Sequence, residues 1–241
     1  MKSIGIMQPY FFPYIGYWQL INAVDEFILF DEVQYIRHGW INRNRILKKG
    51  GGWRYIQIPI EKHSRETLIK DIKIVKDIDI REIIANALSY YKEIRAPNYE
   101  IVMNIINDVL VKDLDCNITK FNKNIMSSIC NYLGIKTPIS ISSDYEFDYT
   151  NVRGSGDWAL EISKQMEVDE YINPIGGKEL FDVKKFDTGG IKIRFLEPYK
   201  IEYKQVGDIF EPSLSIIDVL MFNEKDIIVD MLNKYRLYSG D

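Results

Sequence analysis

The sequence predicts an α/β protein with a mainly parallel, Rossmann-like sheet, helices on both faces of that sheet, and a helical insertion in the middle of the chain. Three observations support this fold class. Short apolar runs alternate with segments whose apolar residues follow the helical period. The first residues read as strand, loop, helix and strand, which is the size of a βαβ crossover. Residues 79–133 show helical periodicity alone.

The N-terminal unit is the clearest part of the pattern. The apolar run 3–7 predicts a buried strand that ends at Gln8-Pro9, and the run 26–30 predicts a second strand. Between them, residues 14–24 have apolar side chains at helical spacings, and Pro13 suits the first turn of a helix. Residues 8–14 are therefore expected to form the loop that leaves the carboxyl end of the first strand.

The middle of the chain changes character at residue 79. Residues 53–60 and 69–75 alternate like strands, and the first of them follows a glycine-rich turn. The segment 79–133 predicts several helices, with Asp79 and Asn117 as N-caps. Gly134 is a plausible helix stop.

Strands and helices alternate again beyond residue 134. The predicted strands are 138–143, 170–174 and 191–198, and the predicted helices are 155–166, a short one within 176–186, and 214–222. We find no repeat, low-complexity tract or linker, so we predict a single domain over residues 1–241.

The composition argues against several functional classes. The 241 residues are 46% hydrophobic and 27% charged, which is ordinary for a globular chain, and the net charge of -4 argues against a dedicated nucleic-acid binder. No signal peptide and no apolar run of about 18 residues are present, so we expect a cytoplasmic protein that does not enter membranes. Cys116 and Cys130 are expected to be reduced thiols, and two histidines are too few for a metal site.

The first candidate site is the loop after the first strand, because ligands of an open parallel sheet bind outside the carboxyl ends of its strands. Gly16 would let the backbone approach a ligand, and the helix N-terminus favours an anion. Aromatic rings that can stack on a flat ring or a sugar are Tyr10, Phe11, Tyr14 and Tyr17. The alternative, in which these rings are core and the prolines shape a turn, is equally consistent with the sequence.

The second candidate site is the segment 31–53, which begins with Asp31 and Glu32 at the carboxyl end of a strand. Cationic residues follow, interleaved with tryptophan and asparagine: Arg37, Arg43, Arg45, Lys48 and Lys49, with Trp40, Asn42 and Asn44. Arginine binds phosphate or carboxylate in a bidentate manner, and a nearby carboxylate can act as a base. The alternative is a solvated loop whose charges pair with each other. His38 is a candidate proton shuttle, although a lone histidine is more often a bystander.

The carboxyl-terminal half offers weaker candidates. The glycine-bearing loop at 153–156 opens a helix and either holds a phosphate or merely caps that helix. Asn173 and Gly177 follow a predicted strand, and Tyr203 lies in a predicted loop. Asp218, inside an apolar helix, requires a buried partner or a position facing solvent.

Several of these segments resemble the signature of the WbqC-like protein family. They are "QPYFFPYIGYWQLI", "DEVQY", "GWINRNRI", "YINPIGGKEL" and "FEPSLSIIDVLMF". The resemblance spans nearly the whole chain. Residues that fall on the family pattern are Gln8, Pro9, Tyr10, Pro13, Tyr14, Gly16, Tyr17, Asp31, Gln34, Trp40, Asn42, Arg43, Asn44, Arg45, Tyr171, Gly177, Tyr203, Pro212, Ser215 and Asp218. His38 falls at a variable position.

This resemblance implies an enzyme of bacterial surface-polysaccharide biosynthesis, including the O-antigen of lipopolysaccharide. A role proposed for the family is the transfer of glycine, or a similar acyl group, to an aminosugar linked to a nucleotide. No tightly bound cofactor is implied; the acyl donor is expected to be a thioester of a carrier protein or of coenzyme A, with an ATP-derived acyl adenylate as the other option.

For such a reaction we assign hypothetical roles to individual residues. Asp31 would orient the amine or take its proton, while Gln8, Asn42 or Asn44 would polarise the acyl carbonyl; His38 remains a further catalytic candidate. Arg43 and Arg45 would hold a diphosphate. The remaining substrate-binding candidates are Tyr10, Tyr14, Gly16, Tyr17, Gln34, Trp40, Asn173, Gly177 and Tyr203.

A fainter likeness links the N-terminal unit to the nucleotidyltransferase superfamily that includes pantothenate synthetase. That superfamily holds ATP phosphates with an H-x-G-H motif, and the matching stretch here is Tyr14-Ile15-Gly16-Tyr17. Both histidines are tyrosines, so the likeness implies the fold more than adenylyl transfer. An ATP-dependent nucleotidyltransferase or ligase and a non-catalytic sugar-nucleotide-binding protein therefore remain alternatives. All three require segments 8–17 and 40–45 to meet over one cleft.

Overall fold

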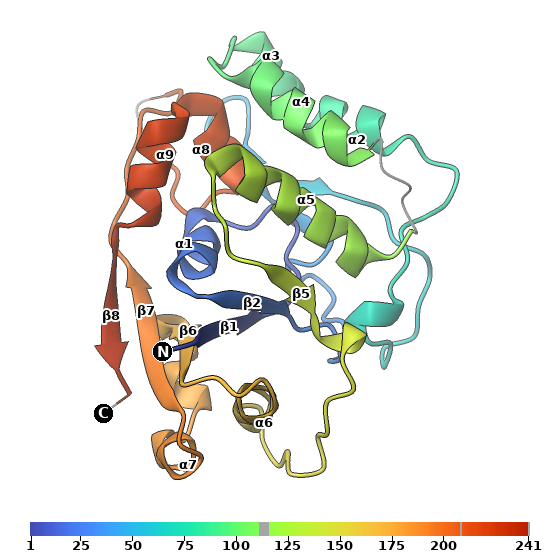
Figure 1. Ribbon diagram of the computed structural model, residues 1–241. Helices are drawn as coiled ribbons and strands as arrows, with labels where there is room; N and C mark the ends of the chain where they lie inside the picture. Colours follow the sequence, from blue (N-terminus) through green and yellow to red (C-terminus); the bar gives the residue numbers. More distant parts are fainter. Residues whose placement is uncertain (111–115, 208, 241) are drawn as a thin grey trace.

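The computed structural model of the protein describes residues 1–110, 116–207 and 209–240 (Figure 1). Its centre is a six-stranded sheet in the order β5-β2-β1-β6-β7-β8. The strands are β1 (Ser3–Met7), β2 (Glu26–Leu29), β5 (Ile139–Ile141), β6 (Glu170–Pro174), β7 (Lys192–Pro198) and β8 (Tyr235–Ser239). The first five run parallel and β8 pairs antiparallel with β7. The predicted fold class is confirmed.

The strand order places one loop at a special position. From β1 the chain moves outward to β2 and β5, and it then returns to β6 on the other side of β1. This is the 3-2-1-4-5-6 order of doubly wound sheets, whose ligands bind at the carboxyl edge where the order reverses. The loop after β1 leaves the sheet at this reversal point.

Helices cover both faces of the sheet, as predicted (Figure 1). On one face lie α1 (Ile15–Ala23), α5 (Ile118–Leu133), α8 (Ile216–Phe222) and α9 (Lys225–Leu232); on the other lie α6 (Asp157–Gln165) and α7 (Val183–Thr188). Phe27 and Leu29 of β2 join the core of the first face, whereas Ile28 joins the core of the second. Because both faces of the strands are buried, the strands read as continuous apolar runs rather than as alternating ones.

The predicted insertion consists of α2 (Ile80–Ala87), α3 (Ser89–Glu93), α4 (Tyr99–Leu110) and α5. Asp79 and Asn117 cap α2 and α5 by accepting hydrogen bonds of 3.0 Å from Glu82 N and Lys120 N. Gly134 ends α5 with a φ of 81°. The part of the predicted helical segment at 111–115 lies outside the described residues. That the whole chain forms one domain stays a prediction.

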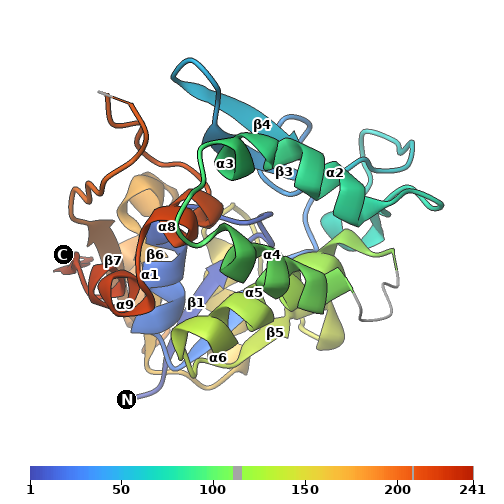
Figure 2. The ribbon, with the colours of Figure 1, turned by 90° about the horizontal axis from the view of Figure 1, so that it is seen from above.

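Two predicted strands differ from the structure. Residues 69–75 form a 3-10 turn, η1 (Ile69–Asp71), followed by isolated bridges, because Ile69, Ile72 and Ile74 all point into the core. The strand predicted at 53–60 is β4 (Trp53–Gln57), and it pairs with β3 (Arg43–Leu47) in a separate antiparallel hairpin. Figure 2 shows this hairpin above α2 and α3. β3 was not predicted, and neither were α9 and β8.

The connections complete the description of the fold. Lys48 N donates to Gly52 O in the hairpin turn, where Gly50, Gly51 and Gly52 all have positive φ. Short 3-10 turns are η2 (Ser142–Asp144) and η3 (Ile175–Leu180). Among the described residues, no helix has the length and apolar character needed to cross a membrane.

Candidate functional site

The loop after β1 lies directly against the segment that leads into β3. Phe11 N donates to Trp40 O at 2.8 Å, and the Asn44 Nδ2 donates to both Phe11 O and Phe12 O at 2.9 Å. From α5, Asn122 Nδ2 joins the same two segments by donating to Pro9 O and Ile41 O. Two segments about thirty residues apart in sequence are therefore held together by side-chain amides from β3 and α5.

The beginning of α8 closes a third side. Ser215 Oγ donates to Phe12 O at 2.8 Å, and Ser215 N donates to Arg45 O at 2.8 Å. Phe12 has a φ of 41°, and Ser213 has a φ of 56°. Such backbone angles cost roughly 1–3 kcal/mol for residues with a Cβ, so the surrounding hydrogen bonds must maintain them.

These three segments enclose a cavity of about 290 Å³, which we call the aromatic cavity. Its lining residues are Tyr10, Tyr14, Trp40, Asn44, Arg45 and Ser213. Neither the Tyr10 nor the Tyr14 hydroxyl has a hydrogen-bond partner within the described parts of the chain. Burial raises the pKa of both tyrosines, and the proximity of Tyr14 raises that of Tyr10 further. Both hydroxyls therefore stay protonated and are available as hydrogen-bond donors.

Arg45 supplies the positive charge of the aromatic cavity. Its guanidinium lies 5.7 Å from the centre of the Trp40 ring and 5.3 Å from that of Trp53, and Nη2 donates to Ser213 O at 3.0 Å. Its Nε is buried and has no hydrogen-bond partner among the described residues. A buried donor without a partner costs free energy, so an anion bound beside this guanidinium would be favourable.

Gly16 and Tyr17 do not have the surroundings that the sequence predicted. A Cβ at Gly16 would lie 2.5 Å from Cε2 of Tyr14, so the Tyr14 ring, and not a ligand, covers this backbone. The Tyr17 side chain is 1% exposed and its hydroxyl donates to Gln8 O at 2.8 Å, which makes Tyr17 a core residue. The Gln8 amide, at the carboxyl end of β1, has no partner among the described side chains.

The two asparagines of the segment are buried and hold the backbone in place. Asn42 Oδ1 accepts from the Tyr35 hydroxyl at 2.9 Å, and its Nδ2 donates to Ile58 O at 3.0 Å. Asn44 uses both N–H groups on the carbonyls of Phe11 and Phe12. Asn44 therefore has no donor left for an acyl carbonyl, and both residues act as positioning residues.

Asp31 lies apart from the lining of the aromatic cavity. The residue is 1% exposed, and its carboxylate accepts hydrogen bonds from Ser142 Oγ at 3.1 Å, Ser143 N at 3.2 Å and Ser143 Oγ at 3.0 Å. Burial raises the pKa of Asp31, and the two serines partly offset this rise. Its role as a base stays a prediction, which this saturated environment does not favour.

A second depression adjoins the start of β3, and we call it the basic basin. It consists of two hollows of about 630 Å³ and 240 Å³ that share Tyr35, Arg37 and His63. The first is also lined by Gln34, Ile36 and Arg65, and the second by His38, Asn42, Arg43, Gln57 and Ile60. Gln34, His38 and Arg43 therefore do not line the aromatic cavity, and Arg43 and Arg45 lie in different depressions.

Comparison with known proteins identifies the chain's relatives. The model of the WbqC-like protein family matches residues 8–229. The chain belongs to this family. The uncharacterized protein Rv1507c of Mycobacterium tuberculosis (strain ATCC 25618 / H37Rv) is 30% identical over 231 residues, which cover 92% of this chain and 94% of the relative. No solved structure matches the chain significantly.

The remaining predicted site residues of this WbqC-like chain form hydrogen bonds or close contacts within the protein. Asn173 accepts from the Tyr171 hydroxyl at 2.7 Å and donates to Pro174 O, and a Cβ at Gly177 would lie 2.5 Å from Asn173 Nδ2. The Tyr203 hydroxyl donates to Asp218 at 2.6 Å, as does that of Tyr91. Asp218 thus has the buried partners that its position in an apolar helix requires.

The glycine-bearing loop before α6 already holds an anion of its own chain. The amides of Arg153 and Gly154 both donate to Asp157 Oδ2 at 2.9 Å, and Lys185 pairs with Oδ1 at 2.6 Å. These amides are therefore not available to a phosphate. Among the described residues, no three metal-ligating side chains gather into a group that could hold an ion.

Sequence reasoning missed several of the lining residues. Ser213 lines the aromatic cavity and its backbone carbonyl accepts from Arg45 Nη2, and nothing in the sequence signals its positive φ. Arg65 and His63 reach the basic basin from a segment that reads as a surface turn. The alternation Arg43-Asn44-Arg45 carried the usable signal, since it predicts a strand with its arginines on one face and its asparagine on the other.

Proposed function

We propose that the protein is an enzyme of surface-polysaccharide biosynthesis that transfers a glycine-type acyl group to the amine of a nucleotide-linked aminosugar. The observation that carries this proposal is the aromatic cavity, in which the rings of Tyr10, Tyr14 and Trp40 stand beside the guanidinium of Arg45. Membership of the WbqC-like family supports the biosynthetic context that the sequence resemblance implies.

The cavity suits the acceptor better than the donor. Aromatic faces bind sugar rings and bases through their apolar surfaces, and the partly unpaired guanidinium of Arg45 binds phosphate oxygens. The cavity opens beside the loop after β1, where the strand order reverses, which is the position of nucleotide sites in doubly wound sheets.

The proposed reaction needs little acid–base assistance. The neutral amine nitrogen attacks the thioester carbonyl, a C–N bond forms, the C–S bond breaks, and the amine proton passes to solvent as the thiolate leaves. Charge develops on the carbonyl oxygen, and protonated Tyr10 and Tyr14 are suited to donate to it. Asp31 is tested separately as the base by the substitution Asp31→Asn.

One observation favours a second candidate, a sugar-nucleotide-binding protein without catalysis. The lining of the aromatic cavity includes no carboxylate and no imidazole, so no described side chain there is suited to general base catalysis. An ATP-dependent ligase or nucleotidyltransferase remains the third alternative.

The experiment combines binding and product analysis. Isothermal titration with UDP-glucosamine compares the wild type with Trp40→Ala and Tyr10→Phe/Tyr14→Phe, and Arg81→Ala on exposed α2 serves as the control. Mass spectrometry then follows amide formation from glycyl thioesters of coenzyme A and of a carrier protein, and from glycine with ATP.

We expect binding that Trp40→Ala weakens about tenfold, and a glycylated product whose rate falls in the double tyrosine variant. Binding without product from any donor would establish the second candidate, and pyrophosphate release with glycine and ATP would establish the third. Absence of binding would refute both the transferase and the binding protein.

A further inference from the structure

We propose that the basic basin is a second ligand site, which binds the phosphate groups of a small organic phosphate. Resting on the function proposed above, this ligand is the phosphate-bearing arm of the acyl donor. The aromatic cavity then holds the acceptor, and the two sites meet at β3.

The charge of the basin supports a ligand of high negative charge. Its lining contains three arginines and both histidines of the chain: Arg37, Arg43, Arg65, His38 and His63. No aspartate or glutamate lines either hollow, and none of these five side chains forms an ion pair with another described residue. Arg43 donates to the backbone carbonyls of Gly39 and His38, whereas no hydrogen bond is formed by the guanidinium of Arg37 or Arg65 within the described residues. In a chain with a net charge of -4, three arginines without a neighbouring carboxylate are suited to an anion from outside.

The geometry of the basin is fixed by the core. Tyr35 lies between the two hollows, because it lines both and its hydroxyl donates to the buried Asn42. The His63 ring packs edge-to-face on Tyr35 at 5.0 Å, and its Nδ1 lies 2.8 Å from Ser64 O. Since a carbonyl oxygen only accepts, Nδ1 is the donor in this contact, and Nε2 donates to a phosphate oxygen when it carries a proton as well. Gln34 Nε2 donates to Arg65 O at 2.5 Å and ties the two walls together.

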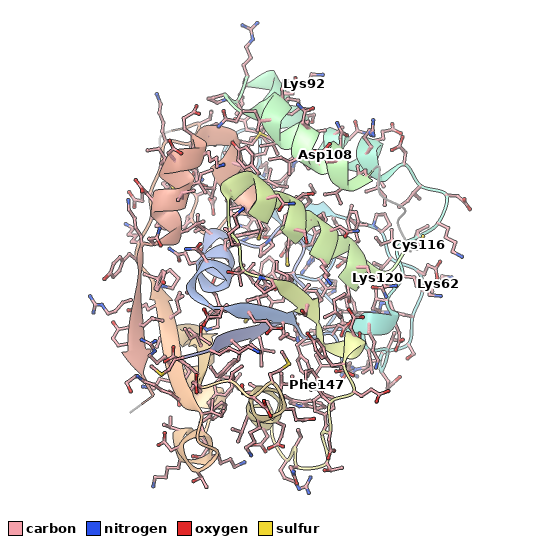
Figure 3. All side chains as sticks on the ribbon, viewed as in Figure 1. Lys62, Lys92, Asp108, Cys116, Lys120 and Phe147 are labelled. Atoms are coloured by element: carbon pink, nitrogen blue, oxygen red, sulfur yellow. The ribbon has the colours of Figure 1, made fainter. Side chains whose placement is uncertain are left out.

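Size and shape favour a small molecule over a nucleic acid. The larger hollow, about 630 Å³, lies within the range of small-molecule sites, and Arg37 and Arg65 line the hollow itself. Figure 3 locates this side of the molecule by Lys62, the chain neighbour of His63. The donors considered for the reaction all carry phosphates: a phosphopantetheine arm, coenzyme A, or an adenylate.

The separation of the two sites favours the longer donors. Asn42 and Arg43 line the basin, whereas the next two residues of the chain, Asn44 and Arg45, line the aromatic cavity, and no described residue lines both sites. An acyl adenylate carries its carbonyl directly on the phosphate, so a phosphate bound in the basin would keep the carbonyl in the basin as well. A phosphopantetheine thioester has an extended arm between the phosphate and the carbonyl, and we therefore infer that it is the donor.

The two histidines provide a direct reporter. Their imidazole signals in ¹H–¹⁵N NMR spectra should shift when inorganic pyrophosphate, coenzyme A or ATP is titrated into the full-length protein. The test variant is Arg37→Ala/Arg65→Ala, since both side chains are exposed and neither has a side-chain hydrogen bond or ion pair to another described residue. Arg81→Ala is the matched control. Thermal unfolding verifies that each variant is folded.

We expect both signals to shift with saturation, with coenzyme A binding more tightly than pyrophosphate or ATP. The double variant should bind about a hundredfold more weakly, about tenfold for each charge-assisted contact, while Arg81→Ala should bind like the wild type. Tighter binding of ATP than of coenzyme A would overturn the assignment of the donor. No shift with any of the three probes, equal binding by the double variant and Arg81→Ala, or binding only of an oligoribonucleotide would overturn the site itself.

The failure of this inference is distinguishable from that of the proposed function. UDP-glucosamine binding that depends on Trp40 and survives Arg37→Ala/Arg65→Ala, together with no phosphate binding in the basin, would refute the basin alone. Phosphate binding in the basin without any sugar-nucleotide binding would refute the acceptor site alone.

Discussion

Replacing Asn44 by alanine should destabilise the protein and disassemble the aromatic cavity. The Asn44 side chain is buried, donates to the carbonyls of Phe11 and Phe12 at 2.9 Å each, and accepts from Arg45 N at 2.8 Å. Phe12 O keeps its bond from Ser215 Oγ, but Phe11 O loses its side-chain donor. The substitution therefore removes the side-chain hydrogen bonds from β3 to the loop after β1. The hydrogen bonds of Asn122 and Ser215 and one backbone bond of Phe11 are left to hold β3 and its approach against that loop.

The size of the effect follows from these contacts. Three hydrogen bonds at about 1 kcal/mol each give a loss of about 3 kcal/mol in the free energy of unfolding, a large part of the 5–15 kcal/mol that is usual for a domain. For a chain of this length that loss lowers Tm by roughly 6–12 °C. Urea denaturation and differential scanning calorimetry measure both quantities, and titration with UDP-glucosamine should show lost binding in the folded variant.

Two further variants sharpen the test. Asn44→Asp keeps the shape but cannot donate to either carbonyl, so it should be at least as unstable as Asn44→Ala. Asn86→Ala on the exposed side of α2 is the matched control and should change stability by no more than about 0.5 kcal/mol. If Asn44→Ala unfolds like Asn86→Ala, or if Asn44→Asp matches the wild type, the reasoning is refuted.

Three other substitutions or modifications have defined outcomes. Gly16→Ala places a Cβ 2.5 Å from the Tyr14 ring, so the ring must move and UDP-glucosamine binding should weaken in calorimetric titrations. Tm should change little, because alanine favours the helix over glycine by about 1 kcal/mol. Unchanged affinity would contradict this prediction. Burial raises the pKa of Asp218 in the folded state, and the hydrogen bonds of Tyr203, Tyr91 and Gln205 oppose this rise. The protonated carboxyl therefore contributes stability that is fully present below the unfolded-state pKa of about 4 and is lost as the pH rises through the folded-state pKa. Urea titrations should therefore show Asp218→Asn gaining stability relative to the wild type across that rise, and a constant difference would refute it. Burial raises the pKa of Cys130 to about 12, so its thiol should not react with iodoacetamide in the folded protein. Peptide mass spectrometry should therefore find alkylation only at Cys116, which lies at the edge of the molecule in Figure 3. Equal labelling of both thiols before unfolding would contradict the fold around α5.

Much of the fold was predictable because the signals are local. Helical periodicity and the caps Asp79, Asn117 and Gly134 located the insertion, and uninterrupted apolar runs located β1, β2 and β6. The prediction of a strand at 69–75 was wrong, because alternating isoleucines can also be buried from an irregular turn. Tertiary contacts supply the hydrogen bonds of that turn. β3 was missed because the polar residues Arg43, Asn44 and Arg45 were interpreted as part of a loop, although their alternation is compatible with a strand.

The candidate site was only partly predictable. Sequence reasoning correctly selected segments 8–17 and 40–45 as neighbours, and Tyr10, Tyr14, Trp40 and Arg45 do surround one cavity. It did not separate Arg43 from Arg45, which occupy different depressions. It also offered Tyr17, Asn42 and Asn44 as ligand-binding groups, although core packing and backbone carbonyls occupy them.

The sequence by itself determined the fold class, the family and the segments that carry chemistry, since periodicity, capping and motif spacing are properties of neighbouring residues. Only the tertiary structure decided which polar side chains are free to bind a ligand and which form hydrogen bonds within the protein. The physical reason is that a buried hydrogen-bonding group must be paired, and its partner is set by chain segments that meet in space, as Asn122 of α5 meets Pro9 and Ile41.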